Sequence, residues 1–209
     1  MVVLVLTATI QPRKYLQYAK LKNPKVRLKE YEDTLKWALG LSNIDRVIFL
    51  ENSSYEYDFT PWENRFNTEN TFFTVVRVPE SYYENKGVGE LELLKSAIPY
   101  INSSDLVIKL TGRVRLPELD KFISEFKDNK PRFKYDPNHR TVKLKTFIFS
   151  MKGEDYINIF GDMEMKDSLS TSFEWTLEKR LEKLNIKYVD FPSMPVDGIN
   201  ASSLKPYEL

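Results

Sequence analysis

Apolar residues open the chain as a nearly unbroken run over residues 1–10, rich in leucine and β-branched side chains. Such a run, followed at once by a polar segment, is typical of a central strand of a parallel sheet whose two faces are both covered. Similar runs over residues 44–50, 72–78 and 105–110 predict further buried strands. The polar and aromatic stretch 51–70 predicts a loop.

Helical spacing of apolar positions alternates with these strands. Asn23 and Pro24 predict the start of a first helix that ends at Gly40, because proline fits the first turn and glycine favours a helix end. Further helices are expected at residues 91–101, 116–126 and 173–184, and further strands at residues 143–151 and 186–191. This alternation predicts a single α/β domain over residues 1–209, with a mainly parallel, Rossmann-like sheet flanked by helices.

The composition excludes several classes of function. Lysine plus arginine (31) nearly balances aspartate plus glutamate (30), so no overall charge attracts nucleic acid or anionic lipid. The chain has no cysteine and only one histidine, His139, which excludes thiolate and multi-histidine metal sites; we expect His139 at the surface. The lack of cysteine suits the cytoplasm, and the apolar opening is shorter than the roughly 20 residues of a membrane span.

Polar segments follow the predicted strands at the places where α/β sheets bind their ligands. They are Thr7-Ala-Thr-Ile-Gln-Pro12, Glu51-Asn-Ser-Ser54 and Lys109-Leu-Thr-Gly-Arg113. Lys109 interrupts an apolar strand and therefore needs a buried partner, while Arg113 is placed to hold a diphosphate with its guanidinium fork. From these residues alone, phosphate binding and an ion pair that ties a strand to a helix are equally good interpretations.

Lys86-Gly-Val-Gly-Glu90 opens the second predicted helix. Its glycines allow a ligand to approach the backbone, the helix start carries partial positive charge, and Lys86 adds a full charge, so a phosphate fits there. The alternative is a glycine turn with solvated charges, and an isolated Gly-x-Gly indicates this alternative rather than a phosphate site. The segment is neither a dinucleotide fingerprint nor a Walker motif.

The order of these motifs, with Arg27 and Tyr31 on the first helix and a closing Gly198-Ile-Asn-Ala-Ser-Ser203, resembles bacterial and viral glycosyltransferases of surface-polysaccharide clusters. These enzymes have the GT-A fold, and the resemblance spans nearly the whole chain. It implies a nucleotide-diphosphate sugar as donor and a hydroxyl of a glycan, lipid-linked or glycoprotein acceptor. It also implies that residues 1–115 bind the donor and residues 116–209 the acceptor.

The resemblance further implies a donor site. Thr7 and Thr9 would lie against the base and ribose, with Glu51 and Asn52 beside them. The donor would also be bordered by Lys86, Gly87, Gly89, Glu90, Thr111 and Gly112.

The segment from Lys109 to Arg113 stands where many members of the family carry an Asp-x-Asp metal motif, which is missing here. The need for Mn²⁺ or Mg²⁺ is therefore open, and Lys109 and Arg113 would instead offset the charge of the leaving diphosphate. Other acidic pairs that could supply metal ligands are Glu56 with Asp58 and Asp162 with Glu164, which we expect to face solvent. A further departure is Ala201, where the family has a second glycine.

Inverting transfer needs a carboxylate that takes the proton of the acceptor hydroxyl. Glu174 is the first candidate, because it opens the last helix between Phe173 and Trp175, whose rings suit an acceptor sugar. Asp162 and Glu90 compete for this role, and a carboxylate in the first turn of a helix is favourable without any catalysis.

Two questions stay open at this point. The aromatic segment 55–62 is either a lid over the acceptor or a cover for the edge of the core. The function is either glycosyl transfer, nucleotidyl transfer to a sugar phosphate, or binding of a nucleotide or glycan without catalysis. The short, glycine-free segment 11–14 after the first strand counts against nucleotidyl transfer.

Overall fold

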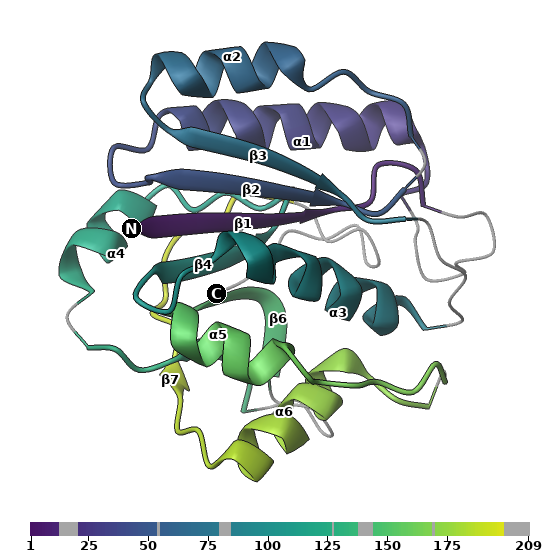
Figure 1. The fold of residues 1–209 in the computed structure, drawn as a ribbon, viewed down its shortest axis with the longest axis vertical. Helices are drawn as coiled ribbons and strands as arrows, with labels where there is room; N and C mark the ends of the chain where they lie inside the picture. Colours follow the sequence, from purple (N-terminus) through teal and green to yellow (C-terminus); the bar gives the residue numbers. More distant parts are fainter. Residues whose placement is uncertain are drawn as a thin grey trace.

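The computed structural model describes residues 1–12, 21–53, 55–79, 85–126, 128–137, 144–168 and 170–198. Within these ranges, seven strands form one sheet in the order β3-β2-β1-β4-β6-β5-β7 (Figure 1). They are β1 (Val2–Ala8), β2 (Arg46–Glu51), β3 (Phe72–Arg77), β4 (Leu106–Thr111), β5 (Arg132–Tyr135), β6 (Leu144–Lys152) and β7 (Val189–Asp190). Strands β1 to β4 are parallel to one another, β6 runs antiparallel to β4 and β5, and β7 is parallel to β5.

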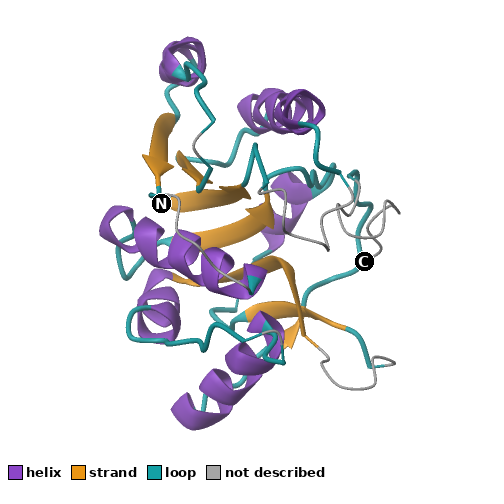
Figure 2. Ribbon diagram, turned by 90° about the vertical axis from the view of Figure 1, so that its right-hand side faces the viewer, coloured by secondary structure: helices purple, strands orange, loops and turns teal. Residues whose placement is uncertain are grey.

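Helices cover both faces of the sheet. They are α1 (Pro24–Leu39), α2 (Thr60–Thr68), α3 (Lys86–Ala97), α4 (Leu119–Glu125), α5 (Gly153–Phe160) and α6 (Phe173–Leu184), with a 3₁₀ turn at Ile98–Tyr100. Helices α1, α2 and α4 pack on one face, and α3, α5 and α6 on the other (Figures 1 and 2). The predicted single α/β domain with a mainly parallel sheet is therefore confirmed. Every helix in the described ranges is too short or too polar to span a bilayer.

The unbroken apolar run of β1 reflects two cores, one on each face. Leu4 and Leu6 enter the core beneath α1, whereas Val3 and Val5 enter the core beneath α3, and all four side chains are fully buried. Because successive side chains of a strand point to opposite faces, a strand covered on both sides reads as a continuous apolar run.

Helix α2, strand β5 and helix α5 were not expected from the sequence. Helix α2 lies inside the predicted loop 51–70 and buries only Trp62 and Phe66, so its apolar pattern is too sparse to detect. Strand β5 has four residues, and only Phe133 is buried. Helix α5 has only eight residues and follows β6 with no intervening residue, so no loop separates the two elements in the sequence.

Gly153 allows α5 to begin in close contact with the turn before β4. Its backbone N–H donates to the carbonyl of Asp105 at 2.8 Å, and an added Cβ would lie only 1.9 Å from the carbonyl oxygen of Asn102. We expect Gly153→Ala to lower the free energy of unfolding by about 1–3 kcal/mol, measured by urea denaturation. Gly40→Ala is the control, because its nearest atom lies at an ordinary 3.4 Å. Equal stability of the two variants would contradict this expectation.

Candidate functional site

The loops after β1 and β2 are joined into one block at the carboxyl edge of the sheet. Glu51, at the end of β2, is fully buried, and its Oε1 accepts hydrogen bonds from Ile10 N at 3.1 Å and Ser53 N at 2.9 Å. The Ser53 hydroxyl donates to the same oxygen. Thr9 Oγ1 donates to Asn52 Oδ1 at 2.6 Å. The structure thus brings together Thr9, Glu51 and Asn52, all of which the sequence singled out.

Arg27 and Tyr31 hold this block from α1. Arg27 Nε donates to the Thr9 carbonyl at 2.6 Å, and Tyr31 Oη accepts from Thr9 N and from Arg27 Nη2, both at 3.0 Å. Both side chains are buried. Their spacing of four residues places them on one face of the helix, so this part of the motif fixes the backbone after β1.

Burial raises the pKa of the Glu51 carboxyl, and the hydrogen bonds from Ser53 and Ile10 oppose this only in part. The folded state therefore retains a proton that the unfolded chain releases above its ordinary pKa of about 4.3. The stabilising effect is present at low pH and is lost as pH rises through the raised pKa. We expect the stability of the wild type relative to Glu51→Gln to fall as pH rises above about 4.3, measured by urea denaturation across pH. A pH-independent difference would contradict the assignment.

Lys109 lies in a polar cluster on the face covered by α3 and α6. Its ammonium is buried, forms an ion pair with Glu90 of α3 and donates to the Thr146 carbonyl at 2.7 Å. Thr7 Oγ1 donates to Glu90 Oε1 at 3.3 Å, and Thr146 Oγ1 donates to Glu174 Oε1 at 3.1 Å. Every member except Thr146 was singled out from the sequence, and the cluster connects β1, α3, β4, β6 and α6.

Arg113 lies on the opposite face. Its Nη1 donates to Glu30 Oε2 of α1 at 2.8 Å, and the side chain is buried. The structure therefore does not bring Lys109 and Arg113 together, as charge neutralisation of one diphosphate would require. The reason is local: Lys109 points towards α3 within β4, whereas Arg113 follows the strand end, where the chain turns towards α1.

The start of α3 is occupied by protein contacts. Asn85 Oδ1 caps the helix by accepting from Gly87 N at 2.8 Å, and Asn85 Nδ2 donates to the Ser168 carbonyl at 2.7 Å. An added Cβ on Gly87 would lie 2.8 Å from Met165 Cε, so this glycine lets α3 pack against the segment before α6. Lys86 is exposed at the helix start.

Gly112 brings the end of β4 against β1. Its N–H donates to the Thr7 carbonyl at 2.8 Å, and an added Cβ would lie 2.9 Å from the same oxygen. Thr111 pairs with Thr7 in the sheet. Gly89 is buried within α3.

The C-terminal part of the described chain returns to the end of β4. Arg115 and Asp197 exchange backbone hydrogen bonds of 2.8 and 2.9 Å and form a salt bridge. Gly198 follows with φ of 147°, and an added Cβ would lie 2.5 Å from the Arg113 carbonyl. The first glycine of the closing motif therefore lies beside Arg113, while residues 199–203 are outside the described ranges.

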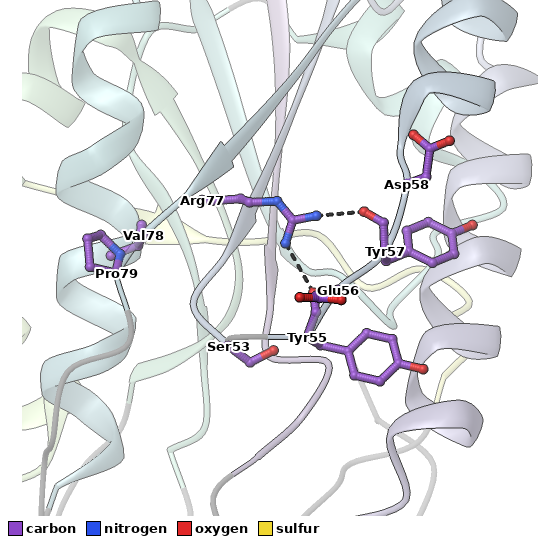
Figure 3. A pocket seen from close by; sticks show the side chains of 8 residues that line it. All are labelled: Ser53, Tyr55, Glu56, Tyr57, Asp58, Arg77, Val78 and Pro79. Carbon is purple, nitrogen blue, oxygen red and sulfur yellow. Dashed lines mark hydrogen bonds between the residues drawn. The ribbon is translucent and has the colours of Figure 1, made fainter.

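An open cavity of about 630 Å³ lies at the same edge, beyond the ends of β2 and β3 (Figure 3). Its lining residues are Ser53, Tyr55, Glu56, Tyr57, Asp58, Arg77, Val78 and Pro79. Arg77, at the end of β3, donates to the carbonyls of Tyr55 at 3.1 Å and Tyr57 at 2.6 Å (Figure 3). The guanidinium thus holds the segment after β2 against β3.

The aromatic segment 55–62 covers the edge of the core. Tyr57 Oη donates to Glu32 of α1 at 2.8 Å and accepts from Trp62 Nε1 at 3.0 Å. Phe59 and Trp62 are buried in the core beneath α1 and α2. Phe59 and Trp62 therefore cover the edge of the core, while Tyr55 and Tyr57 line the cavity, and the second half of the segment begins α2.

The two acidic pairs have side chains at the surface, as expected. Asp58 Oδ1 accepts from Thr60 N at 2.9 Å, and Asp162 forms an ion pair with Arg180. Glu56 and Glu164 are exposed. In the described part of the chain, no group of three or more acidic or histidine side chains is arranged to hold a metal. His139 lies outside the described ranges.

The described residues form a single Rossmann-like α/β domain, with several of the residues singled out from the sequence at the carboxyl edge of its sheet. The chain is similar to UDP-glucose pyrophosphorylase complexed with UDP-glucose, with a TM-score of 0.51 and 7% identity over 97% of this chain and 94% of that one. At this identity the likeness concerns the fold. No family model and no curated protein matches the chain.

Two further solved structures show weaker similarity. One is a putative nucleotide-diphospho-sugar transferase from Desulfovibrio desulfuricans G20, with a TM-score of 0.48 and 9% identity over 91% of this chain and 79% of that one. Another is a nucleoside-diphosphate-sugar pyrophosphorylase from Vibrio cholerae RC9, with a TM-score of 0.47 and 12% identity over 90% of both chains.

Proposed function

We propose that the protein binds a nucleotide-diphosphate sugar at the carboxyl edge of β1 to β4 and transfers the sugar to a hydroxyl of a glycan acceptor. The observation that carries this proposal is the cavity at that edge, beside the joined loops after β1 and β2. Open parallel sheets bind ligands outside the carboxyl ends of their strands, where the strand order reverses, here between β1 and β4. The UDP-glucose held by the similar pyrophosphorylase supports this ligand class.

The donor would run along the edge from β3 to β4. Neighbouring strands lie about 4.8 Å apart, so these two strand ends are separated by three spacings, about 14 Å. We place the nucleoside in the cavity beyond β2 and β3, near Thr9 and Asn52. The diphosphate would cross the end of β1 towards Arg113, and the sugar would extend towards Glu174.

Glu174 would act as the base. Its Oε1 accepts from Thr146, which fixes the carboxylate relative to β6. Trp175 beside it is 47% exposed and offers an aromatic face to an acceptor sugar. Transfer then removes the acceptor proton to Glu174 while the acceptor oxygen bonds to the anomeric carbon and the bond from that carbon to the diphosphate breaks.

Arg113→Ala tests the phosphate contact. We expect about 100-fold slower turnover, because removing one preorganised charge beside a leaving group costs an effect of this order. Glu30→Gln is the matched variant, since it removes the carboxylate that Arg113 contacts but keeps the cation. We expect Glu30→Gln to retain turnover within a few-fold of the wild type, measured as donor consumption. Equal losses in both variants would show that Arg113 serves only to hold Glu30.

Nucleotidyl transfer to a sugar phosphate is the second candidate, favoured by the likeness to UDP-glucose pyrophosphorylase. The enzymes of that class usually present a long glycine-rich loop after the first strand. Here residues 9–23, between β1 and α1, contain no glycine. We therefore rank glycosyl transfer first.

The products of donor turnover distinguish these functions. We expect incubation with UDP-, GDP-, CMP- and dTDP-sugars, with and without Mn²⁺, to release free sugar and the nucleotide from one donor by slow hydrolysis. Formation of a nucleoside triphosphate and a sugar 1-phosphate after addition of pyrophosphate would instead support nucleotidyl transfer. Binding of a donor with no product under either condition would support a binding module and overturn the proposal.

A further inference from the structure

A second cavity, of about 310 Å³, lies where the C-terminal end of α6 meets the end of β5 and the segment before β7. It is lined by Tyr135, Glu178, Leu181, Glu182, Asn185, Ile186 and Tyr188. Its volume is at the lower end of the range of small-molecule sites, so it suits a ligand about the size of one sugar ring. The proposed donor path does not reach it.

Tyr188 is central to the polar lining. Its ring meets Phe133 edge-on, with centroids 5.6 Å apart, which fixes its orientation. Burial raises the pKa of the Tyr188 hydroxyl, and the nearby Glu178, Tyr135 and Glu182 raise it further. The hydroxyl therefore stays protonated and lies within the field of these groups.

The charges of the lining exclude several ligand classes. The carboxylates of Glu178 and Glu182 repel an anion, and Glu182 lies in the last turn of α6, at the negative end of the helix dipole. Both carboxylates are already engaged, Glu178 Oε1 by Leu144 N at 3.1 Å and Glu182 by Lys179 at 2.7 Å, which weakens their attraction for a cation. A neutral ligand rich in hydroxyl groups fits, because carboxylates accept its hydrogen bonds, phenols exchange them, and tyrosine rings pack against its carbon face.

The cavity lies along the face of α6 that carries Glu174. Glu174, Glu178, Glu182 and Asn185 follow one another at intervals of three or four residues, which places them on one stripe of the helix. Eight residues separate Glu174 from Glu182, about 12 Å along the helix axis. This distance corresponds to a short stretch of a linear oligosaccharide.

We propose that this cavity binds a neutral sugar residue of the acceptor glycan, one or two residues away from the hydroxyl that reacts at Glu174. The inference rests on the proposed function for the identity of the acceptor. The binding of a neutral sugar itself does not depend on donor turnover, so the two ideas are tested separately.

The test uses saturation-transfer NMR and calorimetry of the full chain with glucose, galactose, mannose, N-acetylglucosamine and their disaccharides, without donor. We expect at least one of these sugars to bind. The double variant Tyr188→Phe, Glu182→Ala should bind it roughly tenfold more weakly, since each change removes one hydrogen-bonding group. Glu154→Gln, at an exposed position on α5, is the control and should bind like the wild type.

Donor hydrolysis separates failure of this inference from failure of the proposed function. We expect the double variant to hydrolyse the donor at the wild-type rate. Sugar binding that is absent, or unchanged in the double variant, overturns the subsite even where donor hydrolysis is found. Absence of donor turnover would contradict only the proposed function.

Discussion

Glu174→Gln is expected to slow sugar transfer by about 10²–10⁴-fold, the usual contribution of a general base. Glutamine keeps the size of the side chain and can still accept from Thr146 Oγ1, but it cannot take up the acceptor proton. The ground-state complex should therefore be preserved. The measurement is the kcat for transfer, with the Kd for the donor determined separately by calorimetry.

A matched control and the donor Kd make this expectation specific. Glu125→Gln, at an exposed position on α4, should keep the wild-type kcat. The Kd for the donor should stay within about twofold in Glu174→Gln, because a general base contributes to the transition state. An unchanged kcat would remove Glu174 from the reaction, and Asp162 and Glu90 would then be tested in the same way.

Lys109→Ala is expected to lower the free energy of unfolding by about 3–5 kcal/mol, the usual effect of removing one partner of a buried ion pair. The change leaves Glu90 without its cation, opens space in the core and frees the Thr146 carbonyl. The measurement is urea denaturation followed by circular dichroism.

The double variant Lys109→Met, Glu90→Gln separates charge from packing. Replacing a buried ion pair by neutral residues of similar size is often close to neutral, so we expect most of the lost stability to return. A double variant as unstable as Lys109→Ala would show that the loss does not come from the unpaired carboxylate of Glu90. If the double variant is stable but no longer turns over the donor, Lys109 or Glu90 also acts in the proposed reaction.

The elements held by local signals could be predicted closely from the sequence. Helix α6 has the predicted bounds 173–184, and α1 begins at Pro24 with Asn23 as its cap, whose Oδ1 accepts from Lys25 N at 3.0 Å. The two-residue strand β7 was expected to be longer, over 186–191. Its length depends on pairing with β5, a contact across the fold that no local pattern encodes.

The polar cluster shows which part of a site is readable from sequence. A lysine in an apolar strand must find a partner, and the structure supplies Glu90. The identity of that partner depends on how α3 lies across the sheet, which only the tertiary structure determines. Thr146 was missed for the same reason, since a lone threonine in a predicted strand carries no signal of its neighbours.

Arg77 shows what spacing alone does not reveal. In the sequence it is one of many basic residues, at the end of β3. Its role depends on the tertiary structure, in which the segment after β2 returns and places the carbonyls of Tyr55 and Tyr57 against its guanidinium. The direction of Arg113 was equally hidden, because it depends on the turn after β4 rather than on strand alternation.

Thermal melting tests donor binding most directly, because a ligand that binds only the folded state raises Tm. The Tm is measured in the presence of UDP-, GDP-, CMP- and dTDP-sugars, with and without Mn²⁺. We expect donors of one nucleotide to raise the Tm of the wild type increasingly with concentration, and to raise the Tm of Arg113→Ala much less. If no donor at millimolar concentration raises the Tm of the wild type under either metal condition, binding of a nucleotide sugar at this edge is contradicted.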